Sequence, residues 1–253
     1  MGEDDTQPQQ PDEALLIQRH DDRVVATLNR PRVRNAIDQD LVDRLHALCA
    51  ELEASPRILI LTGAGGVFAS GADLNQMLQR RAADARAGIN TRVFMRIHAL
   101  PMPVIAAIDG YALGGGAELA FAADLRIGTP SAKVGNPETG LGIIAAAGAT
   151  WRLPKLVGEA RAAEMLYTGR VLTAAEALDW GILQAIHPAD ELIGAAHALA
   201  DRIAANDPLA VQHTKTALRS TDHPAIDLAL QAELFESPEK TRRMTAFLER
   251  RKR

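Results

Sequence analysis

The chain has 253 residues, of which 47% are hydrophobic and 24% are charged, and its formal net charge is -4. This composition is typical of a soluble globular protein and excludes a fibrous or disordered chain. The acidic balance argues against nucleic acid or anionic lipid as a partner. The single cysteine, Cys49, excludes an internal disulfide and a cysteine-cluster metal site. Cys49 lies at helical spacing from leucines, so we expect a buried small side chain rather than a nucleophile.

The N-terminal segment 1–13, MGEDDTQPQQPDE, is acidic and rich in proline and glutamine. It has neither the apolar region of a secretory signal nor the arginines of a transit peptide, so we predict a disordered tail on a cytoplasmic protein. The longest apolar stretch, 103–123, contains Asp109, Glu118 and four glycines. It therefore predicts a soluble core rather than a membrane span.

The first half of the chain predicts alternating strands and helices. Segments 14–19 and 24–29 predict a hairpin, and 38–54 predicts an amphipathic helix that begins after an aspartate. The continuous apolar run 57–63 ends at glycine, as expected for a strand buried on both faces. Residues 73–100 have a mostly helical pattern, within which the arginine-rich segment 79–88 predicts an exposed lid or loop.

The second half is increasingly helical. Segment 103–110 repeats the pattern of a buried strand followed by glycine, and 124–129 predicts another strand after a short helix. From about residue 155 the apolar positions recur at helical spacing, and only 182–186 predicts a strand among them. The order of elements predicts an α/β core with a helical C-terminal part.

Several common sites are excluded by spacing. The segment GAGGVF has Phe68 where a dinucleotide-binding loop needs its third glycine, and no P-loop lysine follows a glycine-rich turn. Ser70 does not lie in a GxSxG elbow. The seven histidines show no HxxxH spacing, so we predict no metal site.

Three glycine-rich segments each follow a strand-like run: 62–74, 109–120 and 135–150. Loops that lead from buried strands into helix N-termini present free backbone N–H groups, which are the donors that an oxyanion hole needs. Two of these segments carry a glutamate, Glu118 and Glu138, and a pair of carboxylates in a dry pocket suits proton transfer. From the residues alone an alternative stays open, in which each glutamate only occupies the first turn of a helix and complements its dipole.

Four motifs, in order along the chain, carry a family resemblance. The segments NRPRVRNAID, FASGADL and TGRVLTAAEALDWGIL, together with the long segment from PVIAAIDGYALGGGAELA to GNPETGLGI, resemble motifs of the crotonase, or enoyl-CoA hydratase/isomerase, family. The likeness runs from about residue 14 to the C-terminus. It implies a crotonase-like spiral of repeated β-β-α units over 14–197 and a C-terminal helical oligomerisation region over 198–253. It also implies a homotrimer or a dimer of trimers.

The resemblance assigns roles to individual residues. It implies that the backbone N–H groups of Ala72 and Gly115 hold the thioester oxygen and that Glu118 and Glu138 are the catalytic carboxylates. The presence of both glutamates favours an enoyl-CoA hydratase, with CoA as part of the substrate and no other cofactor. The substrate and CoA site implied by the family comprises Arg34, Ala36, Ala72, Asp73, Leu74, Asn75 and Gly115, with Phe247 and Arg250 supplied by a neighbouring subunit.

The chain departs from the family pattern at three positions. Ala145 and Ala146 stand where hydratases usually have proline and glycine, and Asn75 replaces a common lysine. The first change places a methyl group near the acyl chain, and the second leaves Arg32, Arg34 and the basic C-terminal segment FLERRKR to bind the nucleotide. In an alternative interpretation, that segment is only a solvated basic end. Isomerisation or acyl-CoA hydrolysis on the same scaffold, or a catalytically weak acyl-CoA-binding protein, remain the alternatives to hydration.

Overall fold

A computed structural model describes residues 13–251 of the chain. The predicted disordered tail 1–13 lies outside the described residues, apart from Glu13. The structure is built on a six-stranded sheet in the order β1-β2-β3-β4-β6-β9, in which only the β1–β2 pair is antiparallel. Its strands are β1 (Leu15–Arg19), β2 (Arg23–Leu28), β3 (Ile58–Gly63), β4 (Val104–Ile108), β6 (Leu125–Gly128) and β9 (Ala185–Ile186). The predicted hairpin and buried strands are confirmed.

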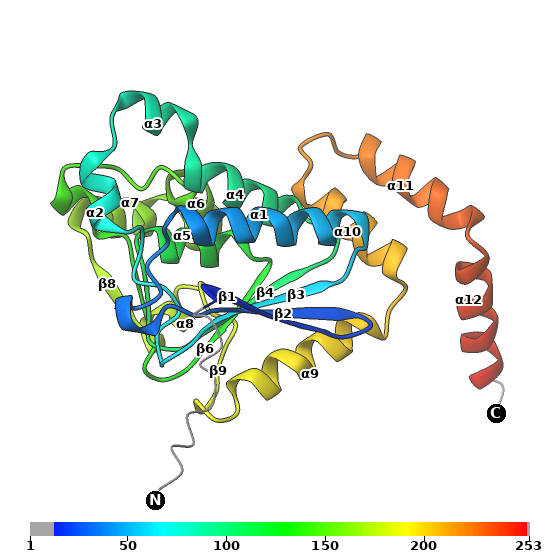
Figure 1. The fold of residues 1–253 in the computed structure, drawn as a ribbon. Helices are drawn as coiled ribbons and strands as arrows, with labels where there is room; N and C mark the ends of the chain where they lie inside the picture. The colour runs from blue at the N-terminus through cyan, green and yellow to red at the C-terminus, as the bar shows by residue number, and fades with distance from the viewer. Residues whose placement is uncertain (1–12, 252–253) are drawn as a thin grey trace, which may run out of the picture.

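Helices cover both faces of this sheet. In Figure 1, α1 (Gln39–Ala54) and α4 (Ile89–Ala99) lie over one face and α9 (Leu192–Ala204) lies under the other. Alternate residues of a strand point to opposite faces, so Leu59 and Leu61 of β3 pack in the core beneath α1, whereas Ile58 and Ile60 pack in the core against α9. Burial on both faces explains why residues 58–61 of β3 and all of β4 are apolar.

The predicted helix 38–54 is confirmed as α1. Asp38 is its N-cap, because its carboxylate accepts a hydrogen bond from the Leu41 backbone N–H at 3.0 Å. The leucine face of α1 is buried in the core. Cys49 is also buried there, as expected.

A second, three-stranded sheet contains β5 (Tyr111–Leu113), β7 (Lys133–Gly135) and β8 (Val171–Thr173). The pair β5–β7 is parallel and the pair β7–β8 is antiparallel. The expectation that 182–186 would be the only strand among the late helices was wrong, because β8 also interrupts them. Three-residue strands are too short to produce a periodic pattern, and they form here because the sheet partner supplies the hydrogen bonds.

The remaining helices lie between the strands and after the last of them. The predicted lid 79–88 is mostly exposed, as expected, but most of it is helical: α2 (Leu74–Gln79) ends at its first residue and α3 (Ala82–Ala87) occupies its centre. The remaining helices are η1 (Pro31–Val33), α2 (Leu74–Gln79), α3 (Ala82–Ala87), α5 (Gly115–Ala122), η2 (Pro137–Leu141), α6 (Ala149–Val157), α7 (Glu159–Thr168), α8 (Ala174–Asp179), α10 (Pro208–Arg219), α11 (Ala225–Glu236) and α12 (Pro238–Arg250).

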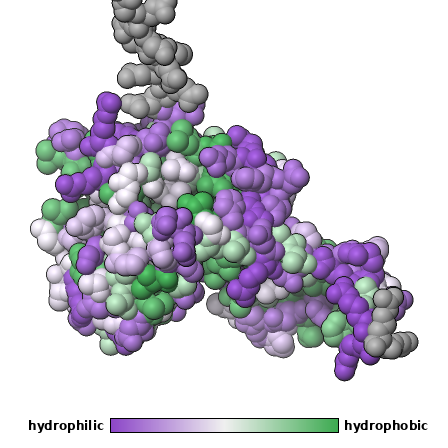
Figure 2. Space-filling view, turned by 90° about the horizontal axis from the view of Figure 1, so that it is seen from below, coloured by the Kyte–Doolittle hydropathy of each residue, from purple (hydrophilic) through white to green (hydrophobic). Residues whose placement is uncertain are grey.

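The last two helices, α11 and α12, form an arm that extends away from the body (Figures 1 and 2). Neither helix has a buried residue. Large apolar side chains are exposed along the arm, namely Leu228, Phe235, Met244, Phe247 and Leu248. The division at residue 197 stays a prediction, and α9 crosses it while packing on the sheet. None of the helices within 13–251 combines the length and apolar character needed to cross a membrane.

Candidate functional site

A cavity of about 910 Å³ is bounded by α2, α3, the start of α4, η2 and the glycine-rich turn before α5. Much of its wall is apolar, with Leu74, Met77, Ile89, Leu141, Ile143 and Ile144 among the lining residues. Five of the predicted site residues line this same cavity, namely Ala72, Leu74, Gly115, Glu118 and Glu138. Segments far apart in the sequence thus supply one site.

Two backbone N–H groups are available in this cavity. Ala72 forms a parallel bridge with Ile37, in which Gly71 O accepts from Ile37 N and Asp73 N donates to Ile37 O. The N–H of Ala72 therefore points away from Ile37. Gly115 is the first residue of α5, where a helix has no acceptor for the N–H. Within the described part of the chain, neither N–H donates a hydrogen bond.

The two free N–H groups lie close together. A Cβ atom placed on Gly115 would be 3.4 Å from the Ala72 nitrogen, and one placed on Gly71 would be 3.8 Å from the Gly115 nitrogen. Two adjacent donors can hold an oxygen that gains negative charge during a reaction. This geometry fits the oxyanion hole that the resemblance implied for Ala72 and Gly115.

The glycines on either side of Gly115 permit this close approach. Gly114 has φ of 52°, a backbone conformation that other residues rarely adopt. A Cβ on Gly116 would lie only 2.2 Å from the carbonyl oxygen of Ala69. The run of three glycines thus makes the turn and lets α5 begin against the chain that leads to Ala72.

Glu118 lies on α5 and is 3% exposed. Its Oε1 accepts hydrogen bonds from the backbone N–H groups of Ala147 at 2.7 Å and Ala149 at 3.1 Å. Burial raises the pKa of Glu118 to about 7, and the nearby Glu138 adds to this, while the two N–H groups oppose it. A carboxyl group that titrates near neutrality can both donate and accept a proton under physiological conditions.

Glu138 lies on η2 and is 8% exposed. Its Oε1 accepts a long hydrogen bond, 3.4 Å, from the side-chain amide of Asn136, while its Oε2 is buried without a partner in the described structure. Burial raises the pKa of Glu138. A Cβ on Gly114 would be 3.1 Å from Glu138 Oε1, so this carboxyl group lies directly against the turn that carries the free N–H of Gly115.

Sequence reasoning missed Asn136, which joins Glu138 to the glycine-rich turn. The Asn136 amide also donates to Gly114 O at 3.3 Å. Its side chain is buried, and its Oδ1 has no partner among residues 13–251. The only available signal was its position two residues before Glu138, and a single sequence gives that position no meaning.

Four of the other predicted CoA-site residues lie near Ala72 without lining the cavity, namely Arg34, Ala36, Asp73 and Asn75. Arg34 is exposed in a left-handed conformation, and the Ala36 carbonyl accepts from Arg30 Nη1 at 2.6 Å. The Asp73 carboxylate caps α2 by accepting from the N–H groups of Asn75 and Gln76. In the single chain, the Asp73 carboxylate therefore stabilises the start of α2.

Phe247 and Arg250 lie on α12, where both are exposed. Figure 1 shows α12 at the opposite end of the molecule from α2 and α3. A single chain therefore does not bring these two residues to the cavity.

The alanines that depart from the family pattern lie on the loop beside Glu118. Ala145 is buried, whereas Ala146 is exposed and lines the cavity. The Ala146 carbonyl accepts from Thr91 Oγ1 at 3.1 Å, which ties this loop to the start of α4. Both hydrogen bonds to Glu118 come from the residues after Ala146, so its added methyl group leaves them intact.

The described residues include no group of three histidine, cysteine, aspartate or glutamate side chains that could hold a metal ion. The polar groups beside the glycine-rich turn are the carboxyl groups of Glu118 and Glu138 and the free backbone N–H groups. This arrangement suits proton transfer next to a carbonyl group.

Comparison with known proteins identifies the family that the sequence motifs resemble. The sequence profile of the enoyl-CoA hydratase/isomerase family matches residues 21–253. The crotonyl-CoA hydratase of Syntrophomonas wolfei is 37% identical, with 95% of this chain and 96% of that protein aligned. The short-chain-enoyl-CoA hydratase of Clostridium acetobutylicum is 36% identical, over 94% and 95% of the two chains.

Solved structures agree with the fold. The crystal structure of an enoyl-CoA hydratase from Bacillus anthracis superposes with a TM-score of 0.89 at 34% identity, and the match covers 94% of this chain and 96% of that one. The fold is therefore the crotonase fold that the sequence motifs implied. The chain belongs to the enoyl-CoA hydratase/isomerase family of enzymes.

Proposed function

We propose that the protein is an enoyl-CoA hydratase, which adds water reversibly across the 2,3 double bond of a 2-enoyl-CoA. The observation that carries the proposal is the pair of buried carboxyl groups, Glu118 and Glu138, in the same cavity as the free N–H groups of Ala72 and Gly115. A reaction with two proton transfers and one charged oxygen uses all four groups.

In the proposed reaction, ionised Glu118 orients a water molecule and removes its proton as the water oxygen bonds to the β-carbon. The electrons of the double bond move onto the thioester oxygen and form an enolate. The N–H groups of Ala72 and Gly115 stabilise that charge, and each such donor contributes about 3 kcal/mol at the transition state. Protonated Glu138 then gives its proton to the α-carbon, and exchange with solvent restores both carboxyl groups.

Hydrogen bonding supports this division of roles. Burial raises the pKa of both carboxyl groups, but Glu118 accepts hydrogen bonds from the N–H groups of Ala147 and Ala149, which favour its ionised form, whereas Glu138 accepts a long one from Asn136. Because the two carboxyl groups interact, they titrate as a pair.

The wider substrate site is also part of the proposal. The CoA moiety would lie along Arg34, Ala36 and the segment 72–75, and no other cofactor takes part. The exposed apolar face of the arm supports a homotrimer or dimer of trimers, in which Phe247 and Arg250 reach the site of a neighbouring subunit. A cytoplasmic location remains part of this proposal.

Product analysis distinguishes hydration from the alternatives. The purified protein would be incubated separately with crotonyl-CoA, a 3-enoyl-CoA and a saturated acyl-CoA, and the products separated by chromatography against 2-enoyl and 3-enoyl standards before their masses are measured. A hydratase adds one water molecule to crotonyl-CoA. Conversion of the 3-enoyl-CoA to its 2-enoyl isomer without hydration would instead show an isomerase, release of free CoA a hydrolase, and binding without turnover a carrier.

The names of the relatives indicate which substrate to assay first. Two of them are named for crotonyl-CoA and short-chain enoyl-CoA, so crotonyl-CoA is the most direct test. Longer 2-enoyl-CoA substrates would then measure how far the wall around Leu74, Ile143 and Ile144 accepts an extended acyl chain.

A further inference from the structure

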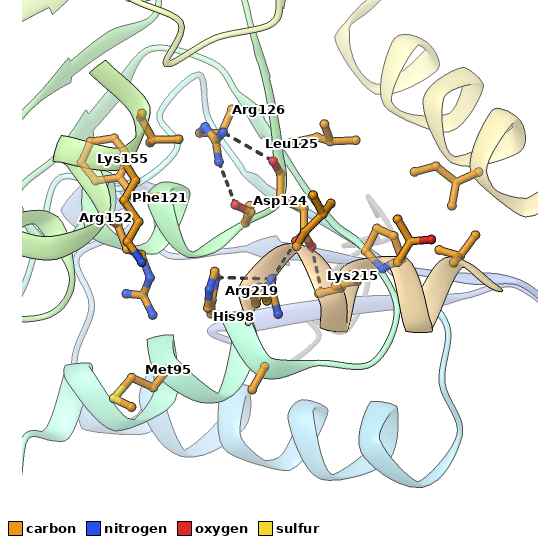
Figure 3. A pocket seen from close by; sticks show the side chains of 18 of the residues that line it. Met95, His98, Phe121, Asp124, Leu125, Arg126, Arg152, Lys155, Lys215 and Arg219 are labelled. Atoms are coloured by element: carbon orange, nitrogen blue, oxygen red, sulfur yellow. Dashed lines mark hydrogen bonds and ion pairs between the residues drawn. The ribbon is translucent and has the colours of Figure 1, made fainter. Parts of the chain in front are cut away.

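A second cavity, of about 940 Å³, lies between α4, α5, α6 and α10. It is lined by several charged or titratable side chains, shown in Figure 3: His98, Asp124, Arg126, Arg152, Lys155, Lys215 and Arg219. Asp124 is the only acid among them, and it pairs with Lys215 at 2.8 Å and Arg219 at 2.6 Å. The remaining cations must be stabilised in other ways.

Arg152 is the buried cation of this cavity with the fewest partners. It is 6% exposed, and among residues 13–251 no carboxylate lies within ion-pair distance of it. Its Nε is buried without a hydrogen-bond acceptor, and its guanidinium lies 5.3 Å from the Trp151 ring. Burying an unpaired charge is costly, so a cation kept in this position needs a compensating interaction.

The contacts of Arg152 lead to Glu118. Arg152 Nη1 donates to the carbonyl oxygen of Ala147 at 3.3 Å, and the N–H of Ala147 donates to Glu118 Oε1 at 2.7 Å. A Cβ on Gly148 would lie 2.2 Å from Arg152 Nη1. The glycine therefore lets the guanidinium lie directly against the turn whose N–H groups hold the carboxylate.

The charges of Arg152 and Glu118 also act on each other. The positive charge of Arg152 lowers the pKa of Glu118, and the Glu118 carboxylate raises the pKa of Arg152 against the stronger effect of burial. The other titratable group acting on Glu118 is Glu138. On the cavity side, Arg152 faces Arg219 and His98. Burial lowers the pKa of His98 to about 4, so it is neutral at physiological pH.

We propose that Arg152 is a positioning residue of the active site, which holds the 147–149 turn against Glu118 and whose charge favours the ionised carboxylate. The kinetic part of this inference rests on the proposed role of Glu118 as the base. The structural part does not, because it concerns the ionisation of Glu118 in the protein without substrate.

Infrared titration of the substrate-free protein tests the inference. The band of the protonated carboxyl group is assigned to Glu118 by its loss in Glu118→Gln, and its midpoint is compared among variants. Arg152→Met should raise the midpoint by about one pKa unit, the lower end of the effect of a nearby opposite charge. Arg152→Lys keeps the charge but lacks the guanidinium fork, so its midpoint should rise by about half as much.

Lys155→Met is the matched control. Lys155 lies on the same helix and lines the same cavity, but it is exposed and makes no hydrogen bond to the 147–149 turn. Its replacement should leave the Glu118 midpoint unchanged. This comparison separates a specific effect of Arg152 from a general loss of positive charge.

Kinetics provide a second readout. A shift of one unit from a pKa near 7 would lower kcat/KM for crotonyl-CoA about fivefold at pH 7, with recovery at pH 9. A purely structural role of Arg152 would lower the rate equally at both pH values and leave the infrared midpoint unmoved.

The infrared and kinetic results separate two possible failures. A shifted midpoint in a wild-type protein that hydrates no substrate would support the role of Arg152 and refute the proposed function. Normal hydration by the wild type, with Arg152→Met and Arg152→Lys both at the wild-type midpoint, would overturn the inference about Arg152. The same holds if Lys155→Met shifts the midpoint as much as Arg152→Met.

Discussion

Replacing Gly116 with alanine tests whether α5 must begin directly against Ala69. The added Cβ would lie 2.2 Å from the Ala69 carbonyl oxygen and 2.8 Å from the Ala69 Cβ. Since carbon–oxygen contacts are comfortable at about 3.3 Å, the two segments must separate by roughly 1 Å. Overpacking of this kind costs about 1–3 kcal/mol of stability. The same displacement separates Gly115 from Ala72, and a misplacement of about 1 Å can lower a rate roughly 100-fold.

The assay combines calorimetry with turnover of crotonyl-CoA. Gly116→Ala should lower Tm by about 2–4 °C for each kcal/mol lost and reduce kcat by roughly two orders of magnitude. Gly194→Ala is the matched control, because Gly194 lies in α9 with open space around its Cβ position. That change should stabilise the helix by about 1 kcal/mol and leave kcat unchanged. If Gly116→Ala keeps the wild-type Tm and kcat, α5 does not need to begin directly against Ala69 and the reasoning is refuted.

Three further changes test other parts of the structure. In the folded protein the pKa of Glu118 is about 7, against an ordinary value of 4.5, so its stabilising contribution is complete below pH 4.5 and is lost as pH rises to 7. Glu118→Gln should therefore gain about 3 kcal/mol over the wild type between pH 4.5 and pH 8, and equal stability differences at both pH values would contradict the raised pKa. Asp38→Ala removes the α1 cap and the ion pair with Arg30, at a cost of about 1–2 kcal/mol in denaturant unfolding; an unchanged midpoint would exclude that cap. Burial raises the pKa of Cys49 to about 12, so a thiol reagent at pH 8 should label it only after unfolding, and rapid labelling of the native protein would show that the site is open.

The central sheet and α1 could be predicted from the sequence because each has a local pattern. The leucines of α1 recur at helical spacing, and residues 58–61 and 104–108 are apolar throughout because both faces are buried. The second sheet could not be predicted, since β5, β7 and β8 have three residues each. Their pairing depends on tertiary contacts that short segments do not encode.

The candidate site was predicted in part. Ala72, Gly115, Glu118 and Glu138 followed from the family motifs, and the structure brings them to one cavity. The role we propose for Arg152 was not predicted, because its link to Glu118 passes through the Ala147 peptide and exists only in the folded chain.

Hydration of crotonyl-CoA by the wild type, Glu118→Gln and Glu138→Gln tests the proposed function most directly. The reaction is followed by loss of the enoyl-thioester absorbance, with Tm measured for each variant. We predict turnover by the wild type and a loss of about 100-fold or more in each folded variant, as expected when a general acid or base is removed. Absence of turnover in the wild type would contradict the proposed hydratase activity, and full activity in either variant would contradict the role of that carboxyl group.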